Sequence, residues 1–196
     1  MKNTPHRLIE LARFRKFGRL LLTRDTGDGQ ILADLAFQTH LGARVIRADG
    51  TTKDYDLGSG LVTSQAVLAF GNWLANVSPV AAGTLNKHDS STGTTAAAVG
   101  DTALGVAPAA TVGARAAGSV ATAVSGANQT FTTVGTQSYT GSLAITEWGL
   151  FNLARTAGAA PPGSDVMLDH KVFAAINVAS GDSIQWTYVL TLNSGG

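Results

Sequence analysis

The sequence contains no cysteine, and only 14% of its 196 residues are charged, against about 25% in a typical soluble domain. The lack of cysteine excludes disulfide bonds, thiolate metal ligands and a cysteine nucleophile. No run of 18 apolar residues occurs, so no membrane-spanning helix is predicted. The first residues also lack the apolar segment of a secretory signal, which predicts that the chain remains in the cytoplasm where it is made. A hydrophobic fraction of 44% indicates a folded body with a core.

The few charges are distributed unevenly along the chain. Residues 1–24 carry a net charge of +6, and the remaining residues carry −5. A segment of this kind, which we call the basic arm, is typical of interaction tails. We predict that the arm binds a protein surface; nucleic-acid phosphates and a membrane surface are less favoured alternatives. The arm residues expected to bind are Arg7, Arg13, Phe14, Arg15, Lys16, Phe17 and Arg19.

The middle of the chain has almost no charge. Between Ser90 and Leu143 the only charged residues are Asp101 and Arg115. An ordinary solvated surface carries more charge than this. Two interpretations stay open: either another chain covers much of this stretch, or the stretch forms a tightly packed sandwich with a Thr/Ser surface.

Periodicity and turn residues predict a mainly β fold with one helix. Asp49-Gly50 between two short β-type runs predicts a hairpin. A helix is predicted over about 62–77, capped by Thr63 or Ser64 and ended by Ser78-Pro79. Its predicted apolar face consists of Val67, Phe70, Trp73, Leu74 and Val77. Five later strands are predicted over 111–124, 129–139, 142–151, 166–178 and 183–193. These elements together predict an antiparallel β-sandwich or barrel with one packed helix.

The body that follows the arm spans residues 25–196. We divide it into hairpins over 25–56, a helical region over 57–80 and a sandwich over 81–196. In the last predicted strand, Trp186 and Tyr188 alternate with polar residues, which is typical of a half-buried strand. The residues expected to form the core are Trp73, Trp148, Phe151, Trp186 and Tyr188.

One predicted strand contains both a glycine and a carboxylate. Gly149 is expected to form a β-bulge that brings Trp148, Leu150 and Phe151 into the core. Glu147 would then lie at a sheet edge or a subunit contact, or would be an ordinary solvated strand residue.

The sequence contains few candidates for catalytic chemistry. Asp169-His170 could pair a base with an orienting carboxylate, but adjacent strand residues point to opposite faces. Asp25-Thr26-Gly27 matches the tripeptide of aspartic proteases, although a turn explains it better. A weak cation site at Asp25 and Asp28 stays open as an alternative. No catalytic residue, cofactor or metal site is predicted, and we do not expect an enzyme.

The part of the chain from residue 56 onward carries recognisable stretches. They are 56–63 (DLGSGLVT), 93–104 (GTTAAAVGDTAL), 144–151 (AITEWGLF), 167–178 (MLDHKVFAAINV) and 181–188 (GDSIQWTY). Together they resemble the small virion structural proteins of tailed bacteriophages. Their order is also similar to the N-terminal module of phage tail-collar fibre proteins. The resemblance covers about residues 56–196.

This resemblance implies a non-enzymatic structural protein located in the virion and assembled in the host cytoplasm. The first expectation is a capsid decoration, or cement, protein that binds the major capsid protein or other virion proteins and stabilises the assembled shell. The alternative is a tail collar, baseplate or fibre-anchoring component. A homo-oligomer is expected, with a trimer among the arrangements, and neither a membrane nor nucleic acid is an expected partner.

Overall fold

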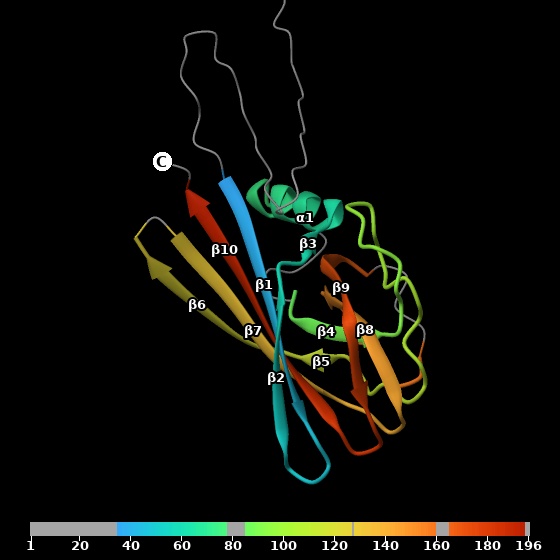
Figure 1. The fold of residues 1–196 in the computed structure, drawn as a ribbon. Helices are drawn as coiled ribbons and strands as arrows, with labels where there is room; N and C mark the ends of the chain where they lie inside the picture. The colour runs from blue at the N-terminus through green and yellow to red at the C-terminus, as the bar shows by residue number, and fades with distance from the viewer. Residues whose placement is uncertain (1–34, 78–84, 127, 160–164, 195–196) are drawn as a thin grey trace, which may run out of the picture.

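The computed structural model describes residues 35–77, 85–126, 128–159 and 165–194, and its described part is a mainly β fold of two antiparallel sheets with one helix (Figure 1). The basic arm, Asp25 and Asp28 lie outside the described residues. The elements are β1 (Leu35–Ile46), β2 (Thr52–Gly58), β3 (Leu61–Val62), α1 (Ser64–Leu74), β4 (Lys87–Ser91), β5 (Ala116–Ala117), β6 (Ser119–Ser125), β7 (Asn128–Ser138), β8 (Leu143–Phe151), β9 (Met167–Val178) and β10 (Ser183–Ser194).

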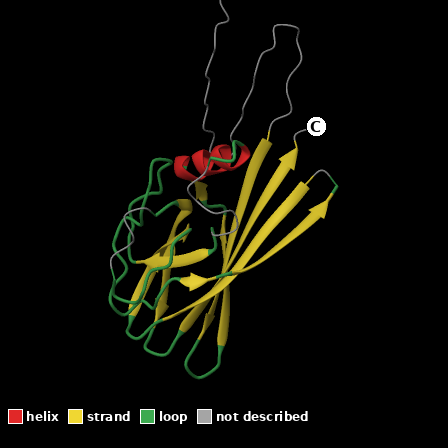
Figure 2. Ribbon diagram, turned by 180° about the vertical axis from the view of Figure 1, so that it is seen from behind, coloured by secondary structure: helices red, strands yellow, loops and turns green. Residues whose placement is uncertain are grey.

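Each sheet has five strands. The first sheet has the order β2-β1-β10-β7-β6, and the second has the order β3-β9-β8-β4-β5. The sheets are not closed into a barrel, so the sandwich form of the predicted fold class is the one observed. Figure 2 shows the long strands of the first sheet crossing the molecule while the loops gather beside the second sheet. Among the described residues, no helix is long and apolar enough to cross a membrane.

The predicted hairpin at Asp49-Gly50 is confirmed. β1 and β2 pair in antiparallel register from Ile46 and Thr52 onward. Gly50 has a φ of 84°, a conformation that glycine adopts without strain, and the Asp49 carboxylate accepts a hydrogen bond from the Thr51 amide at 2.8 Å. Local turn chemistry therefore determines this connection.

Aromatic side chains from both sheets form the core between them. Trp148 of β8 stacks on Tyr188 of β10 with ring centroids 5.4 Å apart, and it also contacts Trp186 at 6.4 Å. Trp148, Trp186, Tyr188 and Phe151 are fully buried, and Trp73 packs half-buried against the same cluster. Four of the five residues predicted for the core therefore belong to this cluster or pack against it. Phe151 is also buried, but its ring lies against the Arg115 guanidinium, 3.7 Å from the ring centroid.

The position predicted for the β-bulge was wrong. Gly149 pairs in register with His170, and the irregularities of the β8–β9 pairing lie on either side of it, between Ile145 and Glu147 and between Leu150 and Phe151. A Cβ at Gly149 would press on the Phe151 ring, so the glycine is needed for close packing rather than for a break in the ladder.

The helix begins as predicted but ends earlier. The Thr63 side chain caps it by accepting a hydrogen bond from the Ala66 amide. At the other end, Asn76 adopts a φ of 55°, and the amides of Asn76 and Val77 bond back to Trp73 and Asn72. This pattern is a Schellman motif, which ends the helix at Leu74, before Ser78-Pro79.

Two residues assigned to the apolar face of the helix do not belong to it. Leu74 is 89% exposed and Val77 is 68% exposed. Val77 lies beyond the end of the helix and so is not on its apolar face, whereas Leu74 is the last helical residue and points to solvent. The prediction was wrong for both. Phe70 does face inward, because its ring lies 5.4 Å from Phe37 and 5.0 Å from Trp73.

Candidate functional site

The largest polar cluster of the described structure surrounds one buried carboxylate, Asp89 of β4. Its Oδ2 accepts hydrogen bonds from Nε of Arg115 and Nε of Arg155, each at 2.8 Å, and its Oδ1 accepts one from Nη2 of Arg155 at 2.7 Å. All three charged groups are almost completely removed from solvent. Because a buried charge is costly unless it is paired and hydrogen-bonded, this geometry holds three distant segments together.

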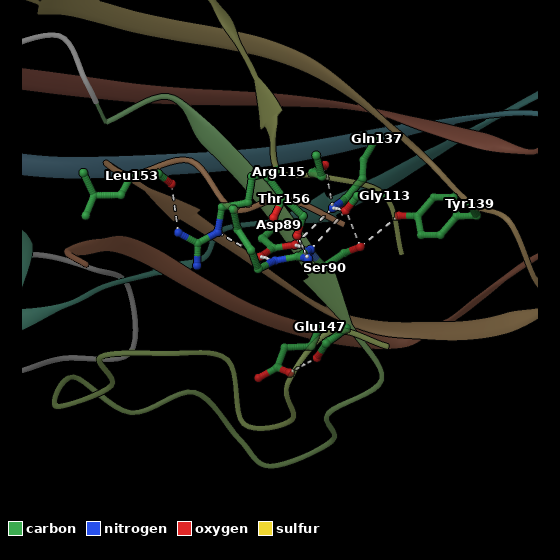
Figure 3. A network of polar contacts seen from close by, with 12 residues as sticks. Asp89, Ser90, Gly113, Arg115, Gln137, Tyr139, Glu147, Leu153 and Thr156 are labelled. Atoms are coloured by element: carbon green, nitrogen blue, oxygen red, sulfur yellow. Dashed lines mark hydrogen bonds and ion pairs between the residues drawn. The ribbon is translucent and has the colours of Figure 1, made fainter. Parts of the chain in front are cut away.

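A second group of partners completes this Asp89 cluster. Asp165 accepts from Arg115 at 2.5 Å, so two carboxylates balance two guanidinium groups. Gln137 of β7 donates to Asp89 at 3.0 Å and accepts from Ser90 at 2.8 Å (Figure 3). Since Asp89 belongs to the second sheet and Gln137 to the first, the cluster ties the two sheets together. Burial raises the pKa of Asp165, against the opposing effect of Arg115.

A second cluster places His170 of β9 between two carboxylates. Nδ1 of His170 lies 2.6 Å from Asp101, and Nε2 lies 2.7 Å from Glu147. Burial alone would lower the pKa of His170, but the hydrogen bonds to Glu147 and Asp101 outweigh it and raise that pKa. A carboxylate at each ring nitrogen favours the charged imidazole, in which both nitrogens donate hydrogen bonds.

Glu147 also anchors the loop that precedes β5. Its carboxylate accepts from the amides of Gly105 at 2.5 Å and Val106 at 3.4 Å, and from the Ser91 hydroxyl. A Cβ at Gly93 would overlap the same carboxylate. Burial would raise the pKa of Glu147, but the hydrogen bonds from His170, Ser91 and Gly105 lower it overall.

The prediction for Glu147 was therefore wrong. The residue is neither at a sheet edge nor solvated; it is fully buried and binds loop amides. The sequence signal for this site was the pair of glycines at 93 and 105. A buried carboxylate needs hydrogen-bond donors close to it, and a backbone without a Cβ can come close enough.

Asp169 and His170 lie on opposite faces of β9, as predicted. Asp169 points between the sheets, where Tyr188 donates to its Oδ2 at 3.2 Å, whereas His170 contacts Glu147 and Asp101. Asp169 is completely buried, and no cation pairs with it among the described residues. Burial raises the pKa of Asp169 to about 7, opposed by the hydrogen bond from Tyr188.

The described surface of the charge-poor stretch carries even less charge than its sequence indicates. Over 90–126 and 128–143, the Arg115 side chain is buried in the Asp89 cluster, and the Asp101 side chain is 27% exposed and paired with His170. The exposed side chains of this stretch, which we call the neutral surface, are small or uncharged, and they include Val106, Val120 and Val124. Serine and threonine are frequent among these exposed residues, so the surface fits both interpretations of the stretch, cover by another chain and a Thr/Ser surface in contact with water.

The described residues offer no place for a metal ion, because no group of three or more His, Asp or Glu among them is arranged to bind one. The chemical capacity of both charged clusters is instead to hold loops on the sheets. The arm residues predicted to bind a partner, and the Asp25-Thr26-Gly27 turn, lie outside the described residues.

Comparison of the chain with protein-family models, with curated protein sequences and with solved structures finds no match.

Proposed function

We propose that this chain is a non-enzymatic structural protein of a tailed-phage virion, and that it acts as a capsid decoration protein. The neutral surface is the observation that carries the proposal. In the stretch from Ser90 to Leu143, one of the two charged side chains is turned inward and the other is largely covered. A surface of this kind is covered by a neighbouring subunit at low cost, because little charge has to be removed from water.

The buried clusters support the same role. The Asp89 cluster and the Glu147 contacts fix loops that would otherwise move, so the surface exists before a partner binds. A preformed surface reduces the entropy that is lost on association. A protein that binds only the assembled lattice stabilises that lattice by mass action, which is the physical basis of cementing.

The basic arm is proposed as the second contact with the shell. Its net charge of +6 is opposite in sign to the rest of the chain, and Phe14 and Phe17 lie among its basic residues. Attraction to an acidic groove between capsid subunits would orient the body, and the neutral surface would then be covered.

Deletion of residues 1–24 is expected to leave a folded body that no longer binds capsids assembled without the chain. The measurement is co-sedimentation with those capsids, with circular dichroism to verify folding. Lys53→Gln is the matched control, because it removes an exposed positive charge outside the arm. Unchanged binding by the deletion variant would show that the arm is not a docking segment. Binding of the full chain to purified tails instead of capsids would favour the tail alternative.

A further inference from the structure

The four edges of the two sheets differ in how they are protected. β3 and β5 are only two residues long, and β2 carries Lys53, Asp54 and Asp56. Short length and charge are the usual means by which natural sheets prevent edge-to-edge pairing. β6 has neither: it is seven residues long, all seven are exposed, and it contains no charged residue and no proline. Among the described strands, β6 is an outer strand of the first sheet and pairs only with β7 (Figure 1).

The sequence of β6 reads the same in both directions. From residue 119 to 125 it is SVATAVS, with Thr122 at its centre. In an antiparallel pair related by a two-fold axis, residue i of one copy faces residue j of the other, and residue j faces residue i. With the axis at Thr122, Val120 faces Val124 of the partner subunit, and Ser119 faces Ser125 of the partner subunit. Every facing pair then consists of identical residue types.

We propose that β6 is a homodimer interface, in which two copies of the chain join edge to edge and antiparallel around a two-fold axis at Thr122. The two five-stranded sheets would become one continuous sheet. The outward-facing N–H and C=O groups of each β6 would be satisfied by the same groups of the other copy. The proposal concerns the free protein and does not depend on the role in a virion.

The side chains of β6 support this pairing. Successive strand residues alternate between faces, so Val120, Thr122 and Val124 share one face. Val120 is 45% exposed and Val124 is 75% exposed in the single chain. In the dimer these three residues and their symmetry mates form one row of β-branched side chains, which pack well in cross-strand pairs. No like charges oppose the contact, because β6 has none.

The first test is sedimentation velocity of the full chain from about 1 to 300 μM, a range chosen because a contact limited to seven residues a side is a small interface. The wild type is expected to form dimers within this range. Thr122→Lys is expected to weaken the dimer at least tenfold, because the two added lysines face each other at the axis. Val124→Lys is expected to weaken it as strongly, because each lysine replaces a valine that faces Val120 of the partner subunit. Val77→Lys is the matched control: Val77 is 68% exposed but follows the helix, and its replacement should leave the association constant unchanged.

The second test uses the absence of cysteine. Thr122→Cys introduces a single thiol, which meets its symmetry mate at the axis. Facing Cα atoms in antiparallel pairs lie about 4.5–5.5 Å apart, within the span of a disulfide. Mild oxidation should cross-link this variant at least tenfold faster than Val77→Cys. A monomer over the whole range, a trimer, or a dimer that neither lysine variant weakens and Thr122→Cys does not cross-link would each overturn the proposal.

Discussion

Asp89→Asn is expected to lower the free energy of unfolding by about 3–5 kcal/mol, because it removes the carboxylate that two buried guanidinium groups share. The change is nearly isosteric, so the loss reports on charge rather than on packing. Arg115 and Arg155 would be left with Asp165 as the only carboxylate of the cluster. Urea denaturation at neutral pH measures the effect, and the thermal midpoint should fall by roughly 10 °C in a chain of this size.

The matched control for this prediction is Asp54→Asn. Asp54 also pairs with an arginine, Arg44, at 2.7 Å, but both side chains are largely exposed. Exposed ion pairs contribute little to stability, so the urea midpoint of this variant should equal that of the wild type. Equal losses in the two variants would contradict the view that the Asp89 cluster is a buried structural cross-link.

Asp169→Asn is expected to change how stability depends on pH. The pKa of Asp169 is raised by burial to about 7 in the folded chain, from an ordinary value of 3.8. The neutral carboxyl contributes fully to stability below the pKa that Asp169 has in the unfolded chain. This contribution is lost as the pH rises through the pKa that it has in the folded chain. Between these values the folded state binds the extra proton, so the stability of the wild type falls from about pH 4 to about pH 7.

Asparagine does not titrate, so its variant lacks this fall. From pH 5 to pH 8, the free energy of unfolding of Asp169→Asn should therefore increase by about 2–3 kcal/mol relative to that of the wild type. Comparing the two pH values cancels any constant cost of the new amide. Denaturation curves of both proteins at each pH provide the measurement. A difference that stays constant would show that Asp169 titrates near its ordinary pKa.

Features that depend on a few neighbouring residues could be predicted from the sequence. The turn at Asp49-Gly50 and the Thr63 cap each depend on contacts within three residues. The alternation around Trp186 and Tyr188 likewise placed both side chains in the core. In each case one strand or one turn contains the whole signal.

Features that depend on distant contacts could not be predicted. Arg115 and Arg155 lie 26 and 66 residues from Asp89 along the chain, and no spacing links them. Each of the three resembles an ordinary surface charge in the sequence, since burial and pairing arise only when the two sheets pack. The same holds for Glu147, whose donors at Gly105 and Val106 come from a loop about 40 residues earlier in the chain. The end of the helix was missed for a different reason: Asn76 adopts a left-handed conformation that is uncommon for residues other than glycine.

These distant contacts relate the fold to the proposed function. The Asp89 cluster draws Arg115 inward, and the His170 cluster does the same for much of Asp101. As a result, the described stretch from Ser90 to Leu143 presents almost no charge to solvent. The internal cross-links and the neutral surface are therefore two consequences of one arrangement, which suits a protein that is covered by neighbours in an assembly.

The stoichiometry of the chain in purified virions tests the central claim most directly. Quantitative mass spectrometry would measure its molar ratio to the major capsid protein. A decoration protein predicts a ratio near one, or a simple fraction of one, because it binds at repeated positions of the lattice. A ratio of a few per cent or less would contradict that placement and assign the chain to the tail or neck, and its absence from purified virions would contradict a structural role in the particle altogether.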